Sequence, residues 1–474
     1  MLSAVVAAAG DPAQLLPART QMAFTLGIHI VLVPFGVAFV ALALIANYRG
    51  LRRGDDVALR LAERWSRVAA VLFAVGAVTG TVLSFELGLL WPGLMRRFGQ
   101  AYGIPFAIEG LFFVLEAIFV AIYIYGWKRM RPWPHFWAGI PVVLAGIGGT
   151  LSVIAANSWM NAPAGYTLRH GRVVSVDPMK VIFNGAFWHE SIHMLLAAYI
   201  VAGFLVGGVY AAAMLRGRRD RYHRVGFLIP FTVAAIAMPF QIVVGDSAAR
   251  WVFNNEPVKF AAMELIPKTT RDAPETIGGA ASQAGEIHGP KITLPGVASL
   301  LSGWSTSTRV RGFTSVPPAD RPPVTIVHLA WDVMVGLGTA LLGLAAWFAL
   351  LWRRRRDLTR STWFLRAASV AGMAALVTMW AGWTVTEVGR QPYIVYGVLR
   401  TRDAVTRADG VWLSLAVVFV LYTLVAAATF LVLRSMARRW RRADAAGVGD
   451  SDVPYGPARV LEANPSSPAA TGTR

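Results

Sequence analysis

No cysteine occurs anywhere in the 474 residues of the sequence. Its absence excludes disulfides, thiolate zinc sites, iron–sulfur clusters and covalently attached c-type haem. A bound metal would have to be held by His, Met, Asp or Glu side chains. Charged residues are also scarce, at 15%, whereas an average soluble domain carries roughly 25%. Because 55% of the residues are hydrophobic, lipid is the expected solvent for most of the chain.

The hydrophobic residues are gathered in nine runs, each near the ~20 residues that a bilayer requires. The sequence therefore predicts an all-α integral membrane protein with nine transmembrane helices. The runs cover residues 21–46, 65–90, 104–126, 136–158, 187–214, 225–244, 326–352, 364–386 and 411–435.

A net charge of +19 would suit a nucleic-acid-binding protein, but its distribution indicates a membrane protein that binds no nucleic acid. Lys and Arg cluster after runs one, three, five, seven and nine, as the positive-inside rule requires of cytoplasmic segments. The N-terminus is therefore expected outside and the C-terminus inside. The clusters are Arg49/Arg52/Arg53, Lys128/Arg129/Arg131, Arg216/Arg218/Arg219/Arg221/Arg224, Arg353 to Arg356 and Arg438/Arg439/Arg441/Arg442.

The runs divide the chain into four parts. Residues 1–244 hold the first six helices, and residues 326–436 hold the last three. Between them, residues 245–325 form a long outer loop between helices six and seven, and a loop of that length is usually functional. Residues 437–474 form a cytoplasmic tail that is basic at first and then rich in Ser, Pro, Gly and Ala, a composition typical of disorder.

Ionisable and metal-binding side chains recur at one depth, in the outer third of the predicted membrane. Each has an ordinary explanation when taken alone: a core histidine, a packing methionine, or a Glu387–Arg390 pair that closes a helix and reaches the headgroups. Two glutamates in one span are harder to explain, because each is costly to insert. His, Met and Glu at a shared depth, without Cys, suit haem. The residues are His29, Glu109, Glu116, His189, His193, Met334, Trp383, Glu387 and Arg390.

A rival motif overlaps this set. Residues 189–193 read His-Glu-Ser-Ile-His and match H-E-x-x-H, the signature of zinc proteases. Such a site also needs a third ligand, and no downstream His or acidic residue stands in a setting that clearly supplies one. An intramembrane zinc protease and a non-oxidase haem-binding or ion-translocating protein both stay open as alternatives.

The stretch Gly382-Trp-Thr-Val-Thr-Glu-Val-Gly-Arg-Gln-Pro392 carries a family resemblance. Ile108-Glu-Gly110, Ala156-Asn157 and Lys259-Phe-Ala-Ala-Met-Glu264 support it. With these motifs, the chain from Gln21 to Arg434 resembles the haem-bearing subunit I of cytochrome bd-type quinol oxidases. The resemblance implies a quinol:oxygen oxidoreductase that reduces O2 to water and separates charge without pumping protons.

For the electron-entry side, the resemblance implies an extracytoplasmic quinol-binding loop over residues 245–325. His193 and Met334 match the axial pair of a low-spin haem b. Lys259 and Glu264 match loop residues involved in quinol oxidation, and Trp383 matches an aromatic between haems.

For the oxygen-reducing side, the resemblance implies two high-spin haems, one haem b and either haem d or a third haem b. His29 and Glu387 match their proximal ligands. Glu109 matches an acidic group beside the oxygen-reducing haem, Glu116 a station on its proton path and Arg390 a partner of haem propionates.

The sequence also departs from the family pattern. Asp332 stands where members commonly have Arg, two residues before Met334, and is expected to change the potential or propionate contacts of the low-spin haem. Ser84 replaces a common Glu, with Glu86 two residues on. Glu109 and Glu116 are one residue closer than in well-known members, and the outer loop resembles the short form. Together these departures are similar to the cyanide-insensitive branch.

Partners and location follow from the same resemblance. It implies a homologous membrane subunit II and small accessory subunits as partners. Quinol and O2 are the implied substrates, and the bacterial cytoplasmic membrane is the implied location.

Overall fold

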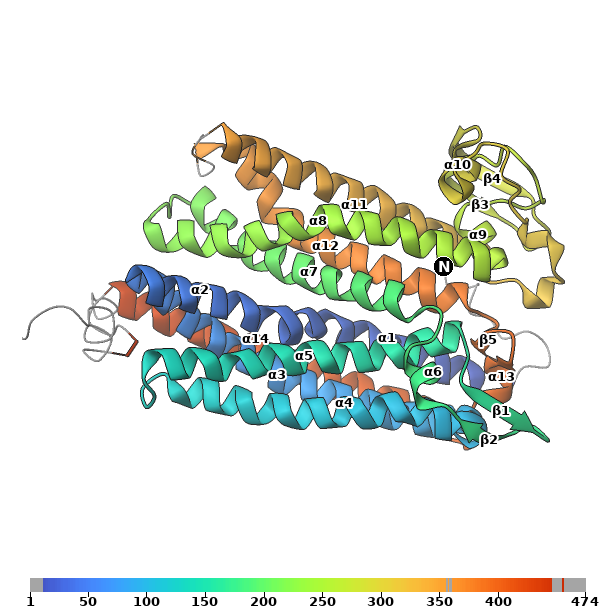
Figure 1. Cartoon of the computed structure of the whole chain (residues 1–474), viewed down its shortest axis with the longest axis horizontal. Helices are drawn as coiled ribbons and strands as arrows, with labels where there is room; N and C mark the ends of the chain where they lie inside the picture. The colour runs from blue at the N-terminus through green and yellow to red at the C-terminus, as the bar shows by residue number, and fades with distance from the viewer. Residues whose placement is uncertain (1–11, 355–356, 358–359, 446–453, 456–474) are drawn as a thin grey trace, which may run out of the picture.

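The computed structural model describes residues 12–354, 357, 360–445 and 454–455, and these are mostly helical. Within them, nine helices are long and apolar enough to cross a membrane, which confirms the helical, multi-span architecture. The helices lie side by side in one elongated bundle (Figure 1). In chain order they are α1–α2 (Leu15–Pro34 and Val40–Arg53), α3 (Asp56–Leu90), α4 (Pro92–Gly126), α5 (Pro132–Asn161), α7 (Phe187–Leu215), α8 (Arg221–Asn255), α11 (Val324–Arg353), α12 (Thr362–Gly389) and α14 (Val411–Ala445).

The all-α prediction needs one correction, because three two-stranded antiparallel sheets occupy the loops. Their strands are too short and mixed in hydropathy to stand out from the sequence. Short helices accompany them: α6 (Pro178–Ile182), α9 (Pro257–Met263), α10 (Val297–Gly303) and α13 (Thr401–Ala404). The sheets pair β1 (Tyr166–Arg169) with β2 (Arg172–Val176), β3 (Glu275–Ala281) with β4 (Ile287–Leu294), and β5 (Tyr393–Val395) with β6 (Leu399–Arg400).

Most helices extend beyond the apolar runs because polar residues cap them outside the hydrocarbon. The Asp55 and Asp220 carboxylates accept hydrogen bonds from backbone N–H groups in the first turns of α3 and α8, which satisfies donors that a helix start leaves free. Gly54, with φ of 60°, ends α2 in the left-handed conformation that glycine tolerates. A π-helical turn, Phe35–Phe39, interrupts the first span.

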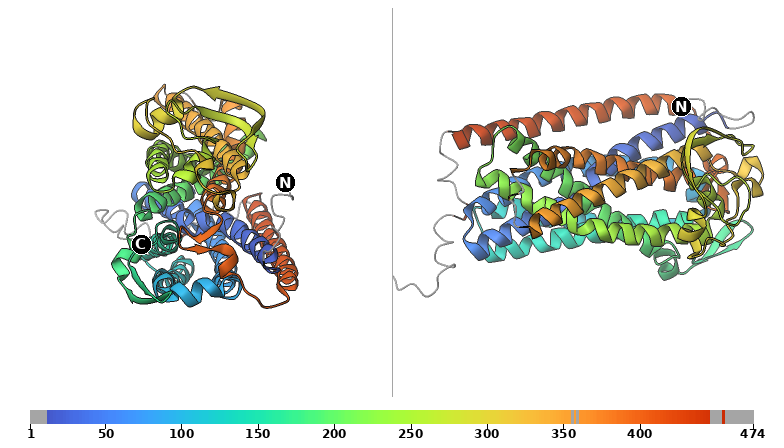
Figure 2. Two further views of the ribbon diagram at one scale, coloured as in Figure 1. Left: turned by 90° about the vertical axis from the view of Figure 1, so that its right-hand side faces the viewer. Right: turned by 90° about the horizontal axis from the view of Figure 1, so that it is seen from above.

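Four helices, α7, α8, α11 and α12, pack together around a shared aromatic core (Figure 1). Phe204, Phe227, Phe231, Phe348 and Phe364 meet there. The helices α1 to α5 form the rest of the bundle, and α14 lies along one edge against α1 and α3 (Figure 2). The first span also contacts α7 and α12, so the two groups are joined directly.

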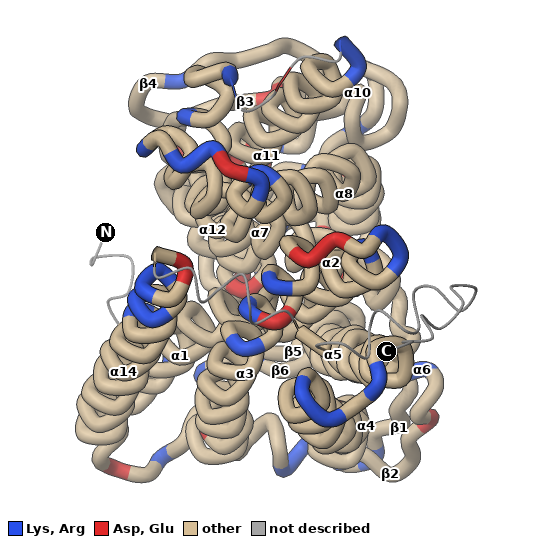
Figure 3. Tube along the Cα trace, turned by 90° about the vertical axis from the view of Figure 1, so that its left-hand side faces the viewer, with Lys and Arg blue, Asp and Glu red and all other residues tan. Residues whose placement is uncertain are grey.

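The two ends of the bundle differ in chemistry. All three sheets lie at one end (Figure 1), and the basic clusters at the ends of the spans gather at the other (Figure 3). This separation agrees with the charge pattern from which the orientation was predicted, while the orientation itself stays a prediction.

The tail prediction lies largely outside the described residues. Ala443 to Ala445 are helical and belong to the end of α14. Tyr455 is described and packs on the helices: its hydroxyl lies 2.6 Å from His135 Nδ1 and donates to Asn47 Oδ1 at 3.3 Å.

Candidate functional site

Two cavities divide the predicted site residues into two groups. The first, here called the α1–α4 cavity, has a volume of about 460 Å³. The second, the α7–α11 cavity, has a volume of about 420 Å³. Both volumes fall in the range of about 300–1,000 Å³ typical of cofactor sites. The α1–α4 cavity is lined by His29, Glu109, Glu116, Glu387 and Arg390, and the α7–α11 cavity by His193, Lys259, Glu264 and Met334. Trp383 lines both.

In the α7–α11 cavity, His193 of α7 and Met334 of α11 are the residues expected to hold the low-spin haem. The His193 Nε2 atom lies 3.1 Å from the Gln241 amide nitrogen, while its buried Nδ1 has no hydrogen-bond partner among the described residues. A methyl group added at Gly245 would lie 3.1 Å from His193 Cε1, and one at Gly382 would lie 3.0 Å from Met334 Sδ. An imidazole and a thioether beside glycines, in a mostly apolar cavity, fit a flat cofactor with iron at its centre.

Lys259 and Glu264 enter the same cavity from the outer loop, where α9 places them. Lys259 is 4% exposed, and its ammonium lies 3.4 Å from Glu256 Oε2. Its aliphatic stem packs over Gly389, where an added methyl would lie 2.9 Å from Lys259 Cγ. Burial, followed by the nearby Glu275 and Asp332 carboxylates, raises the pKa of Glu264 well above its usual range. A buried ammonium and a carboxyl that readily holds a proton are suited to binding and deprotonating a hydroxyl.

Asp332, which departs from the family pattern two residues before Met334, contacts the outer loop. Its Oδ2 accepts a 2.6 Å hydrogen bond from the backbone N–H of Gly278 in β3 and lies 3.4 Å from His328 Nε2. Asp332 therefore ties the β3–β4 hairpin to α11, a contact that the sequence did not suggest.

His328 completes this attachment from one turn earlier in α11. Fully buried, it places Nδ1 2.7 Å from the Met263 carbonyl oxygen and Nε2 2.9 Å from the Gly278 carbonyl oxygen. A carbonyl oxygen only accepts, so both contacts are hydrogen bonds when both ring nitrogens carry protons. His328 thereby connects α11 to Met263 of α9 and to Gly278 of β3.

In the α1–α4 cavity, His29 is oriented by Thr79 of α3. The Thr79 hydroxyl donates to the Val75 carbonyl at 3.1 Å and lies 2.9 Å from His29 Nδ1. With the hydroxyl proton on that carbonyl, the imidazole donates from Nδ1 to Thr79 and Nε2 keeps a free lone pair. A methyl added at Gly80 would lie 3.1 Å from His29 Cε1. These features suit an iron ligand beside a planar group.

Two carboxyl groups line the cavity with His29, and a third, Glu86, is bonded to the same helix, α1. Glu109 and Glu116, both partly buried, lie seven positions apart on α4 and line the cavity together. Glu86 is 4% exposed and accepts hydrogen bonds from Gln21 at 2.8 Å and from Thr25 at 2.6 Å. Glu86 is thus anchored to α1, whereas Ser84 bonds only to the Gly80 carbonyl of its own helix.

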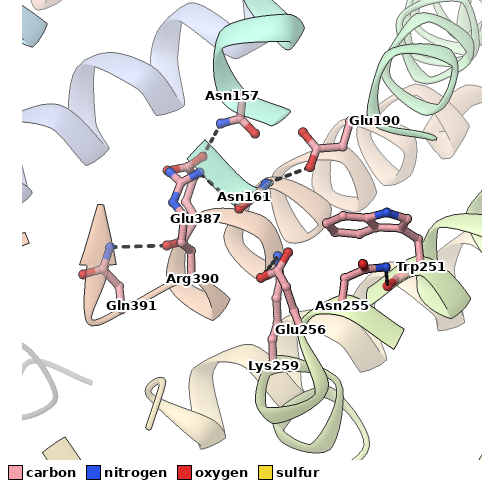
Figure 4. A network of polar contacts seen from close by, with 10 residues as sticks. All are labelled: Asn157, Asn161, Glu190, Trp251, Asn255, Glu256, Lys259, Glu387, Arg390 and Gln391. Carbon is pink, nitrogen blue, oxygen red and sulfur yellow. Dashed lines mark hydrogen bonds and ion pairs between the residues drawn. The ribbon is translucent and has the colours of Figure 1, made fainter. Parts of the chain in front are cut away.

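A chain of hydrogen bonds joins the two cavities near the end of α12 (Figure 4). Glu387 accepts from Asn157 at 2.5 Å and from Arg390 at 2.6 Å. Arg390 also donates to Asn161 at 3.2 Å, and Asn161 donates to Glu190 at 2.7 Å. Glu387 lines the α1–α4 cavity and Glu190 the α7–α11 cavity.

Arg390 is therefore internal, and the Glu387 side chain, which is 27% exposed, lines the α1–α4 cavity. Arg390 is 2% exposed, and its Nε has no partner among the described residues. This burial rules out the interpretation in which the pair merely closes a helix and extends to the headgroups. Both Glu387 oxygens are hydrogen-bonded, yet a carboxylate oxygen has two lone pairs, so the arrangement is compatible with a metal ligand.

The H-E-x-x-H segment has other partners. His189 Nδ1 lies 3.2 Å from the Ser247 hydroxyl, Glu190 is bonded to Asn161, and His193 faces Gln241. Across the part of the chain that is described, no three His, Asp or Glu side chains are grouped as a metal site requires. The geometry of a zinc protease site is not met there.

Several residues of this site were missed from the sequence, notably His328, Gln241, Asn161 and Glu275. None belongs to a short motif, and polar residues near helix ends are common in any membrane protein. The one available signal was position, because His328 lies one turn before Asp332 and Asn161 one turn after Asn157.

Comparisons with known proteins agree on one family. Residues 17–440 match the model of the cytochrome bd terminal oxidase subunit I family. A Bacillus subtilis protein assigned provisionally as a cytochrome bd menaquinol oxidase subunit I is 31% identical over 416 residues, covering 87% of this chain and 93% of that protein. The cytochrome bd ubiquinol oxidase subunit 1 of the same organism is 28% identical over 443 residues, covering 90% and 94%. The solved structure of bd oxidase from Geobacillus thermodenitrificans superposes with a TM-score of 0.84 at 31% identity, covering 90% of this chain and 98% of that one.

Proposed function

Because the chain belongs to the cytochrome bd terminal oxidase subunit I family, we propose that it oxidises quinol at the outer face and reduces O2 to water. A quinol oxidase role, haem as cofactor and a multi-pass membrane protein follow from the family itself. The haem types, the residues that hold them and the separation of charge are our proposal.

The observation that carries the proposal is the division of the site residues between two cavities with Trp383 between them. One cavity contains the residues expected for quinol oxidation together with an axial His/Met pair. The other contains a second histidine and the intramembrane carboxyl groups. An oxidase needs this arrangement, because electrons must enter at one place and reach oxygen at another.

In this proposal, His193 and Met334 hold a low-spin haem b. His29 and Glu387 hold the two high-spin haems, one haem b and either haem d or a third haem b. When bound, these groups supply one-electron redox chemistry and an iron at which oxygen is reduced. The protein orients them through Thr79, the glycines beside the ligands, and the guanidinium of Arg390, which suits propionates.

Quinol binds in the α7–α11 cavity under the outer loop. Lys259 orients one hydroxyl through its ammonium, and Glu264 accepts a proton from the ring oxygen. His328 also lies against the Met263 carbonyl oxygen and so connects α11 to the α9 segment that carries both residues.

Protons for water formation come from the inside through Glu116 and then Glu109, since intramembrane carboxyl groups are the usual relay residues. Protons from quinol leave to the outside, because Lys259 and Glu264 lie on the outer loop. The enzyme would then separate charge across the bacterial cytoplasmic membrane without pumping protons.

A homologous subunit II is the proposed partner. In their most apolar windows, α3, α4 and α14 are 17%, 6% and 11% buried, against 56% for α7. Because α3 and α4 also bound the α1–α4 cavity, a second membrane subunit on this side would enclose it. Small accessory subunits would fit the same exposed side.

The test compares Met334→Leu with Met373→Leu, a control at an exposed position of α12. We expect Met334→Leu to abolish the low-spin haem band in the reduced-minus-oxidised spectrum and quinol-driven oxygen uptake, while the control keeps both. An unchanged low-spin band in Met334→Leu would remove this residue from the site. For the native protein, haem without oxygen uptake would indicate a carrier, and zinc without haem would indicate a protease.

A further inference from the structure

Two carboxyl groups of the outer loop meet at the wall of the α7–α11 cavity. Glu264 follows α9, and Glu275 is the first residue of β3. Both line the cavity, and their side chains are within hydrogen-bonding reach of one another. In each, the Oε2 atom is shielded from solvent and makes no hydrogen bond among the described residues. The Trp331 side chain lies close enough to Glu264 to favour its ionised form, but burial and the neighbouring carboxylates outweigh this effect.

Such a contact between two ionised carboxylates would be repulsive, but one proton shared between them turns it into a strong hydrogen bond. The surroundings favour that proton. Asp332 of α11 adds a third carboxylate nearby. The positive groups on the surrounding elements have other partners: Lys259 lies beside Glu256, His328 bonds to two carbonyls, and Arg250 of α8 is bonded to Asp246.

We propose that Glu264 and Glu275 form a carboxyl pair that shares one proton, and that Glu275 is the residue through which Glu264 passes quinol protons to the outside. This inference rests on the proposed function, because it needs quinol as the substrate of the α7–α11 cavity. It adds Glu275, a residue outside the sequence motifs, as a proton-transfer partner in the outer loop.

Quinol gives up its two protons one at a time. An O–H bond of quinol breaks, its proton moves to the pair, and the pair then holds two protons and no net charge. One proton leaves through Glu275, which is less buried than Glu264, and the pair returns to its singly protonated state. The second hydroxyl repeats the cycle. The two electrons released with the two protons pass to the oxidase's electron acceptor, and the quinol becomes quinone.

The experiment measures quinol-driven oxygen uptake against pH for the whole oxidase carrying Glu275→Gln, Glu275→Asp or Glu264→Gln. Glu286→Gln, at an exposed position of the same loop, is the matched control. An artificial donor that reduces the haems directly provides a second assay on the same samples.

For Glu275→Gln we expect kcat with quinol to fall by roughly a hundredfold, as loss of a proton-transfer group commonly causes, with donor-driven uptake unchanged. The pH profile should also move. The base in this cycle is the singly protonated pair, whose anion is stabilised by the shared hydrogen bond; a lone Glu264 lacks that stabilisation, so the rising limb of activity shifts to higher pH. Glu275→Asp should restore part of the rate, which a purely structural role would not explain.

The inference would be overturned if Glu275→Gln kept wild-type turnover and pH profile while Glu264→Gln lost turnover. That result would leave the proposed function intact. Absence of quinol turnover in the native protein, with haem present, would overturn the proposed function instead. If Glu275→Gln does not assemble, infrared spectroscopy of the native enzyme decides. A carbonyl stretch from a protonated carboxylic acid that Glu264→Gln abolishes supports the pair, and its absence contradicts it.

Discussion

Single residues of the site are held by partners from distant parts of the chain. Arg390 donates hydrogen bonds to Glu387 of α12 and to Asn161 of α5. The His29 imidazole of α1 lies within hydrogen-bonding distance of the Thr79 hydroxyl of α3. In a low-dielectric interior, each of these contacts is costly to leave unmade. Substitutions here should therefore affect stability and cofactor binding more than their small size suggests.

Arg390→Gln should lower stability by about 1.5–3 kcal/mol, because it removes charge-assisted hydrogen bonds of a buried guanidinium to Glu387 and Asn161. Thermal unfolding of the purified protein measures the effect. Arg366→Gln is the matched control, since that side chain is exposed and stacks on Trp363. Equal melting temperatures for the two variants would contradict a role for these hydrogen bonds.

Thr79→Val removes the hydroxyl that lies 2.9 Å from His29 Nδ1 while keeping the shape of the side chain. Loss of such a hydrogen bond commonly weakens metal affinity by about 10- to 100-fold, so haem occupancy at the His29 site should fall. Haem content per chain and high-spin absorbance measure it. Thr81→Val, whose hydroxyl bonds only to its own helix, should leave both unchanged.

At the scale of helices and loops, the helices pack closely where small residues lie between them, and the outer loop is attached by a few hydrogen bonds. Gly203 and Gly372 lie against the backbones of α8 and α7, with no room for a side chain. Contact at this range is how membrane helices gain packing energy without a hydrophobic driving force. The outer hairpin, by contrast, is held to α11 by polar groups.

Gly372→Ala should destabilise the α7–α12 contact, because the new methyl would overlap Leu205. Overpacking of this kind typically costs about 1–3 kcal/mol. Gly343→Ala in α11 meets open space, so it should be neutral or slightly stabilising. Thermal unfolding of the two variants separates packing from helix propensity, and a fall in both would contradict the explanation.

His328→Leu should release the β3–β4 hairpin from α11, because it removes the contacts of the imidazole with the Met263 and Gly278 carbonyl oxygens. We expect faster proteolysis of residues 275–294 and a higher KM for quinol, with haem spectra preserved. His288→Leu, on the exposed strand β4, is the control. Unchanged proteolysis in His328→Leu would show that other contacts hold the hairpin.

The whole molecule has two unlike ends with the site nearer one of them. The sheets and the outer loop cover one end, and the Lys and Arg clusters mark the other (Figures 1 and 3). The net charge of +19 is thus concentrated where the positive-inside rule places the cytoplasm. Quinol protons would then be released at the end opposite to the basic clusters.

The absence of cysteine makes this orientation directly testable with single introduced thiols. A membrane-impermeant maleimide should label Ser307→Cys, on the exposed outer loop, in intact cells. It should label Ala445→Cys, at the end of α14, only after the membrane is opened. The reverse pattern would invert the proposed topology and place quinol oxidation inside.

The hydropathy of the sequence determined the nine spans found in the described part of the chain, and the distribution of Lys and Arg determined the charge asymmetry. Lipid offers the backbone no hydrogen bonds, so a long apolar run is a helix almost regardless of its neighbours. The motif around Glu387 and Arg390 likewise pointed to the family before any contact was known.

Only the tertiary structure decided which residues share a cavity and which partners they take. It separated His29 from His193, turned Asp332 toward the hairpin, placed Glu275 beside Glu264 and buried Arg390 beside Glu387. The physical reason is that the depth of a side chain follows from its position along one helix. Its partners depend on how that helix is rotated and packed against segments that are hundreds of residues away.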